Sequence, residues 1–199
     1  MIRALALLLA LTSPATANPG RDLAAAAEAQ VGVTVIYDPA YVGLEFPGGD
    51  LPRERGVCTD VVIRALRDAW GIDLQAATNA DMKRNFAAYP PLWGLRTTDR
   101  NIDHRRVPNL ETLFTRAGAA LPLSSDPVAF EPGDIVSFRL TGTALPHIVI
   151  IAESTAPDGT PLVTHNIGAG TRTEHMLFDH PMQGHFRLTD AARTWLAAR

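Results

Sequence analysis

The chemically reactive residue that stands out in this chain is Cys58, the single cysteine among 199 residues. It follows Gly56 and begins a segment whose apolar residues recur at helical spacing. At a helix start, unpaired backbone N–H groups and the helix dipole favour a thiolate and can stabilise an oxyanion. Asp60 opposes the thiolate through its like charge. Placement alone therefore leaves two interpretations open, a catalytic thiol and a buried structural cysteine.

His147 is the candidate base for this thiol, because it begins the apolar segment H-I-V-I-I-A-E directly after Pro146. The unperturbed pKa of histidine, about 6.5, suits proton transfer near neutrality. His165 and Asn166 are adjacent candidates for the group that orients the imidazole ring. Since a strand alternates its faces, only one of them can point toward His147. The residues alone leave open which of the two takes this role, while the other can hydrogen-bond the following turn.

A dense polar cluster forms the candidate substrate-binding segment. It comprises Asp103, His104, Arg105 and Arg106. Arginine suits bidentate contacts with a substrate carboxylate. The same residues could instead pin their own loop through salt bridges, an interpretation that we favour slightly from sequence. Asp60 and Asn166 are further candidates for substrate contact.

The remaining polar and aromatic groups give weaker signals. His175, His180 and His185 recur at a spacing that matches no metal-binding motif on a helix or strand, and a second cysteine is absent from the chain. The sequence therefore predicts no metal site, and nothing in it calls for a cofactor. Trp70 and Trp93 are expected in the core rather than on a sugar-binding surface.

The helices and strands that must position these residues are predicted from the spacing of apolar residues, which changes from helical to extended along the chain. We expect helices over Asp22–Val31, Cys58–Trp70, Ala80–Ala88 and Leu110–Ala117, a short strand over Val33–Tyr37, and long loops over Pro39–Gly56 and Thr97–Pro108. We expect strands over Ile135–Leu140, His147–Glu153 and Leu162–Asn166, and near His175–Phe178 and Gly184–Leu188. Helices followed by antiparallel strands are typical of an α+β domain.

The order of these motifs resembles that of the NlpC-like cysteine peptidases. The segments are G-V-C-T-D-V-V, E-P-G-D-I-V-S-F, P-H-I-V-I-I-A and L-V-T-H-N-I-G. More closely, Val33–Leu188 resembles the bacterial domain-of-unknown-function family 1287. That resemblance rests on Y-D-P-A-Y-V, R-G-V-C-T-D-V-V-I-R, N-I-D-H-R-R-V-P-N-L and H-N-I-G-A-G, which occur in this order.

The resemblance implies a papain-like fold with N-terminal helices packed on an antiparallel C-terminal sheet. It places the nucleophile at Cys58, the base at His147 and the orienting residue at His165. It also implies hydrolysis of amide bonds in peptidoglycan stem peptides or a related peptide substrate. Two alternatives stay open, a non-catalytic wall-binding module on the same fold and a thiol-dependent acyltransferase.

Charge and the N-terminal segment bear on location and partners. The net charge of −3 and the absence of a Lys- or Arg-rich run argue against a nucleic-acid partner. Arg3, the apolar run Ala4–Leu11 and the small residues Ala15 and Ala17 together are typical of a secretory signal peptide. We therefore expect residues 1–17 to be removed and residues 18–199 to form a single exported domain, periplasmic or extracellular. The apolar run is shorter than the ~20 residues that span a bilayer, and we expect no transmembrane segment in the mature chain.

Export predicts a defined mature N-terminus. N-terminal sequencing of protein recovered from the exported fraction should begin at Asn18, because cleavage is expected after Ala17. Accumulation of the full-length chain in the cytoplasm would contradict this assignment.

Overall fold

The computed structural model describes residues 19–199, so the expected signal peptide lies outside the described residues. Five α-helices are described: α1 (Pro19–Glu28), α2 (Cys58–Trp70), α3 (Leu74–Asn85), α4 (Val107–Arg116) and α5 (Asp190–Ala197). Short 3-10 turns occur at Phe86–Ala88, Asp103–Arg105 and Pro127–Ala129. Among residues 19–199, none of the helices is both long and apolar enough to cross a membrane.

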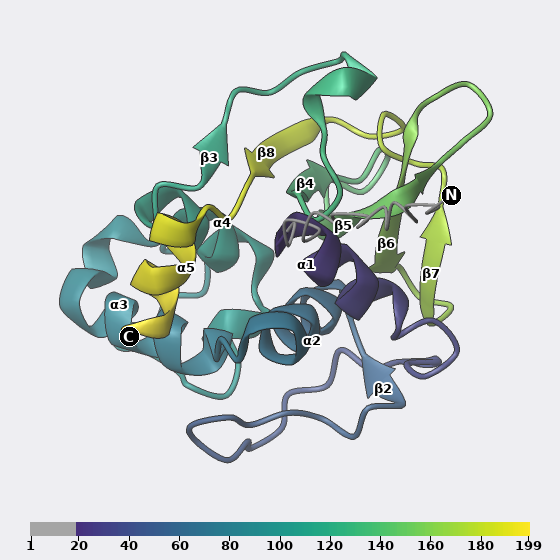
Figure 1. Cartoon of the computed structure of the whole chain (residues 1–199). Helices are drawn as coiled ribbons and strands as arrows, with labels where there is room; N and C mark the ends of the chain where they lie inside the picture. The colour runs from purple at the N-terminus through teal and green to yellow at the C-terminus, as the bar shows by residue number, and fades with distance from the viewer. Residues whose placement is uncertain (1–18) are drawn as a thin grey trace, which may run out of the picture.

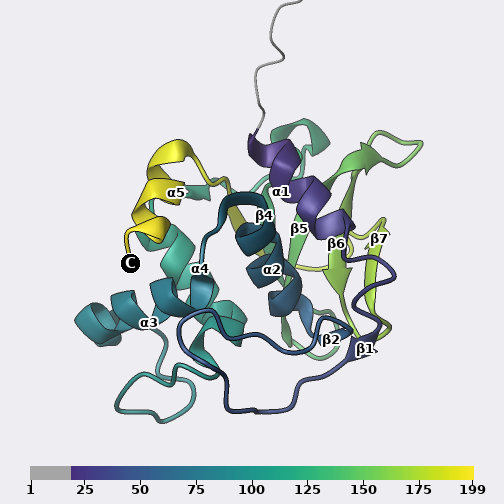
Figure 2. The ribbon, with the colours of Figure 1, turned by 60° about the horizontal axis from the view of Figure 1, so that its bottom comes forward.

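The main sheet has six strands in the order β3-β8-β4-β5-β6-β7. Their bounds are β3 (Ala120–Leu121), β4 (Ile135–Arg139), β5 (Pro146–Thr155), β6 (Pro161–Asn166), β7 (Thr171–Glu174) and β8 (Met182–Phe186). Every neighbouring pair is antiparallel. Helices α1 and α2 pack against β5 (Figures 1 and 2). The expected α+β class, with N-terminal helices packed on an antiparallel sheet, is confirmed.

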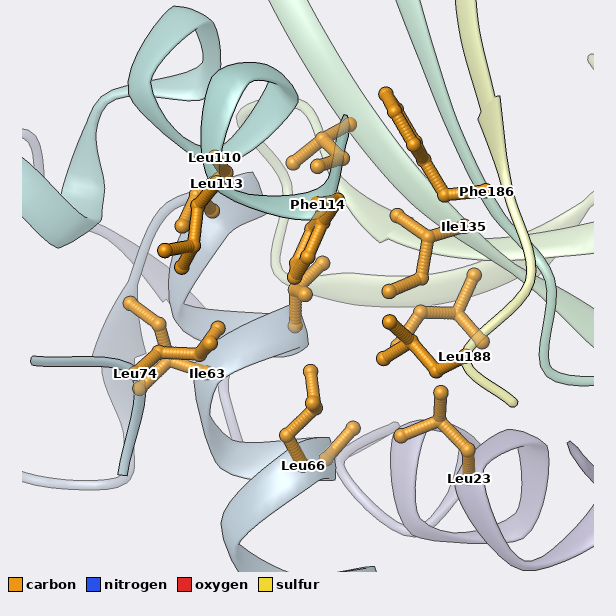
Figure 3. Close-up of a cluster of buried hydrophobic side chains, with 14 of the residues drawn as sticks. Leu23, Ile63, Leu66, Leu74, Leu110, Leu113, Phe114, Ile135, Phe186 and Leu188 are labelled. Atoms are coloured by element: carbon orange, nitrogen blue, oxygen red, sulfur yellow. The ribbon is translucent and has the colours of Figure 1, made fainter. Parts of the chain in front are cut away.

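The larger part of the core lies between the helices and the sheet. Leu23 of α1, Leu66 of α2, Phe114 of α4 and Ile135 of β4 meet there (Figure 3). A second apolar cluster, which includes Val149, lies on the opposite face of the sheet. Strand β5 contributes to both clusters, which explains why its sequence is almost continuously apolar.

Helix α2 has the bounds that its sequence predicts. Its apolar residues at helical spacing are buried, and Gly71 ends it at φ 66°. That left-handed conformation favours glycine, and the Gly71 N–H donates to the carbonyl of Arg67. Cys58 is therefore the first residue of the helix.

Other elements differ from expectation for identifiable reasons. Helix α3, expected over Ala80–Ala88, starts at Leu74, because the Asp73 carboxylate accepts hydrogen bonds from the backbone of Gln75 and Ala76. The prediction of a strand near His175–Phe178 is wrong. The strand in this region is β7, which ends at Glu174, and the chain then leaves the sheet and buries Met176 and Leu177 in the second cluster.

The N-terminal strand is also shorter than expected. Only β1 (Ile36–Tyr37) is extended, and it pairs in parallel with β2 (Arg55–Gly56) at the end of the long loop. Strand β3 and helix α5 were not anticipated from the sequence.

The long loop before Cys58 is fixed to α2 by one buried side chain. Arg64 is fully buried and donates to the Asp50 carboxylate, to the Leu51 carbonyl and to the hydroxyl of Thr34. Since these partners lie along the loop and just before it, the guanidinium holds the loop against the helix. Tyr37 at the end of β1 and Pro39 at the start of the loop line the same cleft as Cys58.

Candidate active site

A cleft of about 370 Å³ opens beside Cys58. Its lining includes Tyr37, Trp93, Arg106 and Pro146, which come from separate segments of the chain. Cys58 itself is only 7% exposed, so its thiol lies at the base of the cleft rather than on the surface. The position suits a nucleophile that meets substrate in a partly enclosed site.

The thiol packs against the beginning of β5. Burial raises the pKa of Cys58 to about 11, against the opposing effect of a hydrogen bond from the Ile148 backbone N–H. The nearby carboxylate of Asp60 raises it further. Near neutral pH the thiol of the free protein is therefore protonated. The contact with Ile148 places the sulfur beside the β5 backbone, one residue after His147.

His147 is buried and belongs to a chain of imidazole rings. Its Nε2 lies 2.8 Å from Nδ1 of His165, and the two rings are nearly perpendicular. Burial lowers the pKa of His147 to about 3, and repulsion from His165 adds to that effect. His147 is therefore neutral near neutral pH, and the same shift makes it a weaker base than an exposed histidine.

Glu174 extends this chain beyond the residues predicted from the sequence. Its Oε1 lies 2.9 Å from Nε2 of His165. In the register of β6 and β7, His165 is opposite Arg172, and Glu174 shares the face of Arg172 two residues later. Alternation along T-R-T-E would have placed Glu174 on the same face as Arg172. Glu174 was missed from the sequence because the strand was expected to begin after that residue.

Asn166 points away from the imidazole chain, as the alternation of strand faces requires. Its side-chain amide donates to the Gly56 carbonyl at 3.0 Å, and its oxygen accepts from the Gly168 backbone N–H at 3.1 Å. Asn166 therefore ties the following turn to the residue two before Cys58. His165 is the candidate that lies within hydrogen-bonding distance of His147, while its role in turnover stays a prediction.

Asp60 and Arg105 form an ion pair within the protein. Arg105 Nε and Nη2 donate to the two carboxylate oxygens of Asp60 at 2.9 and 3.0 Å, and both side chains are at most 3% exposed. Arg105 also donates to the carbonyls of Asp38 and Ala40, and Asp60 accepts from the Val57 backbone N–H. With these partners, the pair builds the wall of the cleft, and its charges are engaged inside the protein.

Of the other three members of the polar cluster, two lie in the core and one lines the cleft. Asp103 and His104 are buried, and burial raises the pKa of Asp103 and lowers that of His104 to about 4. Arg106 donates to Asp103 at 3.1 Å and lies over the ring of Trp93, 4.1 Å from its centroid. Trp93 is 38% exposed at the cleft, so the expectation of a core position is wrong for this tryptophan.

Two further histidines, His185 and His175, lie away from the His147–His165 pair. His185 is buried 2.8 Å from Asp134, whereas the exposed His175 lies 3.4 Å from Asp158. Within residues 19–199, no group of three or more His, Cys, Asp or Glu side chains is arranged to hold a metal ion.

The fold and the site define an α+β protein in which a thiol at a helix start contacts the backbone of β5, and in which His147 of β5 and His165 of β6 form a buried imidazole pair. The chain belongs to the domain-of-unknown-function family DUF1287, whose pattern matches residues 24–188. It is similar to the Escherichia coli (strain K12) protein described as "Uncharacterized protein YijF". The two are 54% identical over 171 residues, which cover 86% of this chain and 82% of the relative. No solved structure matches the chain significantly.

The buried ion pair predicts an unequal response to two substitutions in α2. Asp60→Ala should lower the free energy of unfolding by about 3–5 kcal/mol, because it leaves the Arg105 charge buried without its partner. Asp68→Ala is the matched control, since Asp68 pairs with Arg53 at the surface and should cost under about 1 kcal/mol. Urea unfolding measures both. Equal losses of unfolding free energy in the two variants would show that the Asp60–Arg105 pair contributes no more stability than a surface pair.

The raised pKa of the thiol predicts slow labelling of the free protein at neutral pH. Because Cys58 is the single cysteine, iodoacetamide reports on it alone. The alkylation rate should increase with pH up to about 11, since only the thiolate reacts and burial holds its population low. A plateau already reached near neutral pH would mean that the folded protein stabilises the thiolate.

Proposed function

We propose that this protein is an exported cysteine hydrolase that cleaves amide bonds in peptidoglycan stem peptides through an acyl-thioester on Cys58. The observation that carries the proposal is the position of Cys58 at the start of α2 and at the base of a cleft, with its thiol hydrogen-bonded to the backbone of Ile148, the residue after His147 in β5. His165 lies 2.8 Å behind His147 and supplies the orienting group. Nucleophile, base and orienter are the three roles that thiol catalysis requires.

In the first half of the reaction, the Cys58 sulfur attacks the substrate carbonyl carbon while its proton passes to His147. A resting thiolate is not needed for such general-base attack. Backbone N–H groups at the start of α2 would stabilise the oxyanion that forms. The imidazolium then protonates the leaving amine as the C–N bond breaks, which leaves the acyl group on sulfur.

Water completes the cycle. His147, neutral again, removes a proton from a water molecule as the water oxygen attacks the thioester carbonyl. The C–S bond breaks, the sulfur regains a proton and the carboxylic acid is released. Burial of His147 favours return of the proton at each step, because a buried imidazolium is a strong acid.

Several features support placement among NlpC-like, papain-fold peptidases. The thiol helix precedes the antiparallel sheet in the chain, and the base and orienter lie on adjacent strands β5 and β6. Arg106 lines the cleft, and beyond the nitrogen that donates to Asp103 its guanidinium has further donors for a substrate carboxylate, as an acidic stem peptide would present. The predicted signal peptide agrees with a substrate outside the cytoplasm.

A non-catalytic wall-binding module is the second candidate. The high pKa of Cys58 favours it, because an inert thiol would also be buried and protonated. The two functions differ in whether peptidoglycan is cut. An acyltransferase differs in turn by passing the acyl group to an amine rather than to water.

Digestion of purified peptidoglycan, with the products weighed by mass spectrometry, tests the proposal. Wild-type protein should release fragments that each carry the mass of one added water, and Cys58→Ser and His147→Ala should release none. His165→Ala should slow release by tens- to thousands-fold, because an orienting group acts through the base.

The control is His175→Ala, which removes an exposed histidine outside the site and should leave the rate unchanged. Thermal melts of each variant check folding. Full activity in Cys58→Ser would exclude the thiol mechanism, and an Asn166→Ala variant more damaged than His165→Ala would reverse the orienter assignment. Binding of peptidoglycan by the wild-type protein without cleavage would favour the wall-binding module.

A further inference from the structure

We propose that Glu174 is a positioning residue that sets the tautomers of His165 and His147, so that the ring nitrogen left for Cys58 is the unprotonated one. This inference rests on the proposed function and assigns a role to a side chain outside the nucleophile–base–orienter set. It follows from the geometry of three groups in a row: Glu174 Oε1 to His165 Nε2 at 2.9 Å, and His165 Nδ1 to His147 Nε2 at 2.8 Å.

Two neutral histidines joined by a hydrogen bond have a directional ambiguity. A neutral imidazole carries one N–H and one acceptor nitrogen, so either ring can donate to the other. If His147 Nε2 donates to His165, then His147 Nδ1 is an acceptor and can serve as a base. If His165 Nδ1 donates instead, the proton of neutral His147 sits on Nδ1, and the ring offers the thiol no lone pair.

Glu174 removes this ambiguity from the far end of the chain. A carboxylate accepts hydrogen bonds and does not donate them, so the proton of neutral His165 must lie on Nε2. His165 Nδ1 is then an acceptor, which obliges His147 to donate through Nε2. One carboxylate therefore dictates the proton position on two successive rings, the second of which is His147, the proposed base.

The surroundings of His165 show that this role falls to Glu174. Burial lowers the pKa of His165, while the charge and hydrogen bond of Glu174 oppose that shift and Arg172 reinforces it. Arg172 has only donors and cannot accept the Nε2 proton. His180, the other group acting on His165, is engaged with the Thr141 hydroxyl at 3.2 Å.

The strand order makes this chain possible. Strands β5, β6 and β7 are consecutive neighbours in the sheet and carry His147, His165 and Glu174 in that order. The side chains thus run across three strands, from the buried His147 to Glu174 at the sheet edge. Glu174 is 42% exposed there, so the far end of the chain meets solvent while the near end is buried.

Imidazole nitrogen NMR on protein with isotope-labelled histidine tests the tautomers without any substrate. Protonated and unprotonated ring nitrogens resonate far apart, and His147→Gln and His165→Gln variants assign the two rings. In wild-type protein near pH 7, both rings should carry the proton on Nε2. In Glu174→Ala, a measurable fraction of both rings should move the proton to Nδ1.

Turnover on purified peptidoglycan provides the second readout. Glu174→Ala should lower it by about 10- to 100-fold, the usual effect of losing a group that orients a site residue. Glu174→Gln retains an acceptor oxygen at the same reach but adds an N–H donor, so it should restore the Nε2 tautomer and the rate only in part. Glu153→Ala, which removes an exposed carboxylate at the end of β5, is the matched control and should change neither.

The two readouts separate this inference from the proposed function. Unchanged tautomers in Glu174→Ala overturn the role of Glu174, even if wild-type protein hydrolyses peptidoglycan at full rate. Shifted tautomers support it, even if the wild-type protein cuts no peptidoglycan, a result that would count against the proposed hydrolase alone. Loss of activity without a tautomer shift would assign Glu174 a purely structural role and also overturn the inference.

Discussion

The buried ion pair between Asp60 and Arg105 is the interaction on which the rest of the site depends. Removing both charges from water costs several kcal/mol per ion, and only a full set of hydrogen bonds compensates for it. Arg105 meets that requirement by donating to Asp60 and to two loop carbonyls, while Asp60 also accepts from the Val57 backbone. The pair therefore fixes both the wall of the cleft and the turn from which Cys58 emerges.

Burial also sets the charge states of Cys58 and His147, the proposed nucleophile and base. It raises the pKa of Cys58 and lowers that of His147, so the thiol and the imidazole rest as a neutral pair. Any catalysis must then move a proton during attack rather than start from a preformed thiolate. That requirement makes the position of the proton on His147 decisive, since a ring protonated on the wrong nitrogen cannot accept one.

The antiparallel sheet sets the positions of the imidazole pair and of Asn166. Adjacent strands place side chains of matching faces side by side, and the same alternation sends Asn166 to the opposite side of β6. There Asn166 holds Gly56 and the turn at Gly168, which anchors the approach to Cys58. The imidazole chain and the support of the thiol loop thus come from neighbouring residues of one strand.

The sequence by itself determined what short-range periodicity and composition control. Helical spacing closed by Gly71 defined α2, the apolar run identified β5, and the single cysteine at a helix start marked the candidate nucleophile. The tertiary structure alone decided that Arg105 points inward to Asp60 while its neighbour Arg106 faces the cleft, and that Glu174 meets His165. Asp60 and Arg105 are 45 residues apart, and strand register depends on the whole sheet. A local pattern cannot encode which distant charge compensates a buried one.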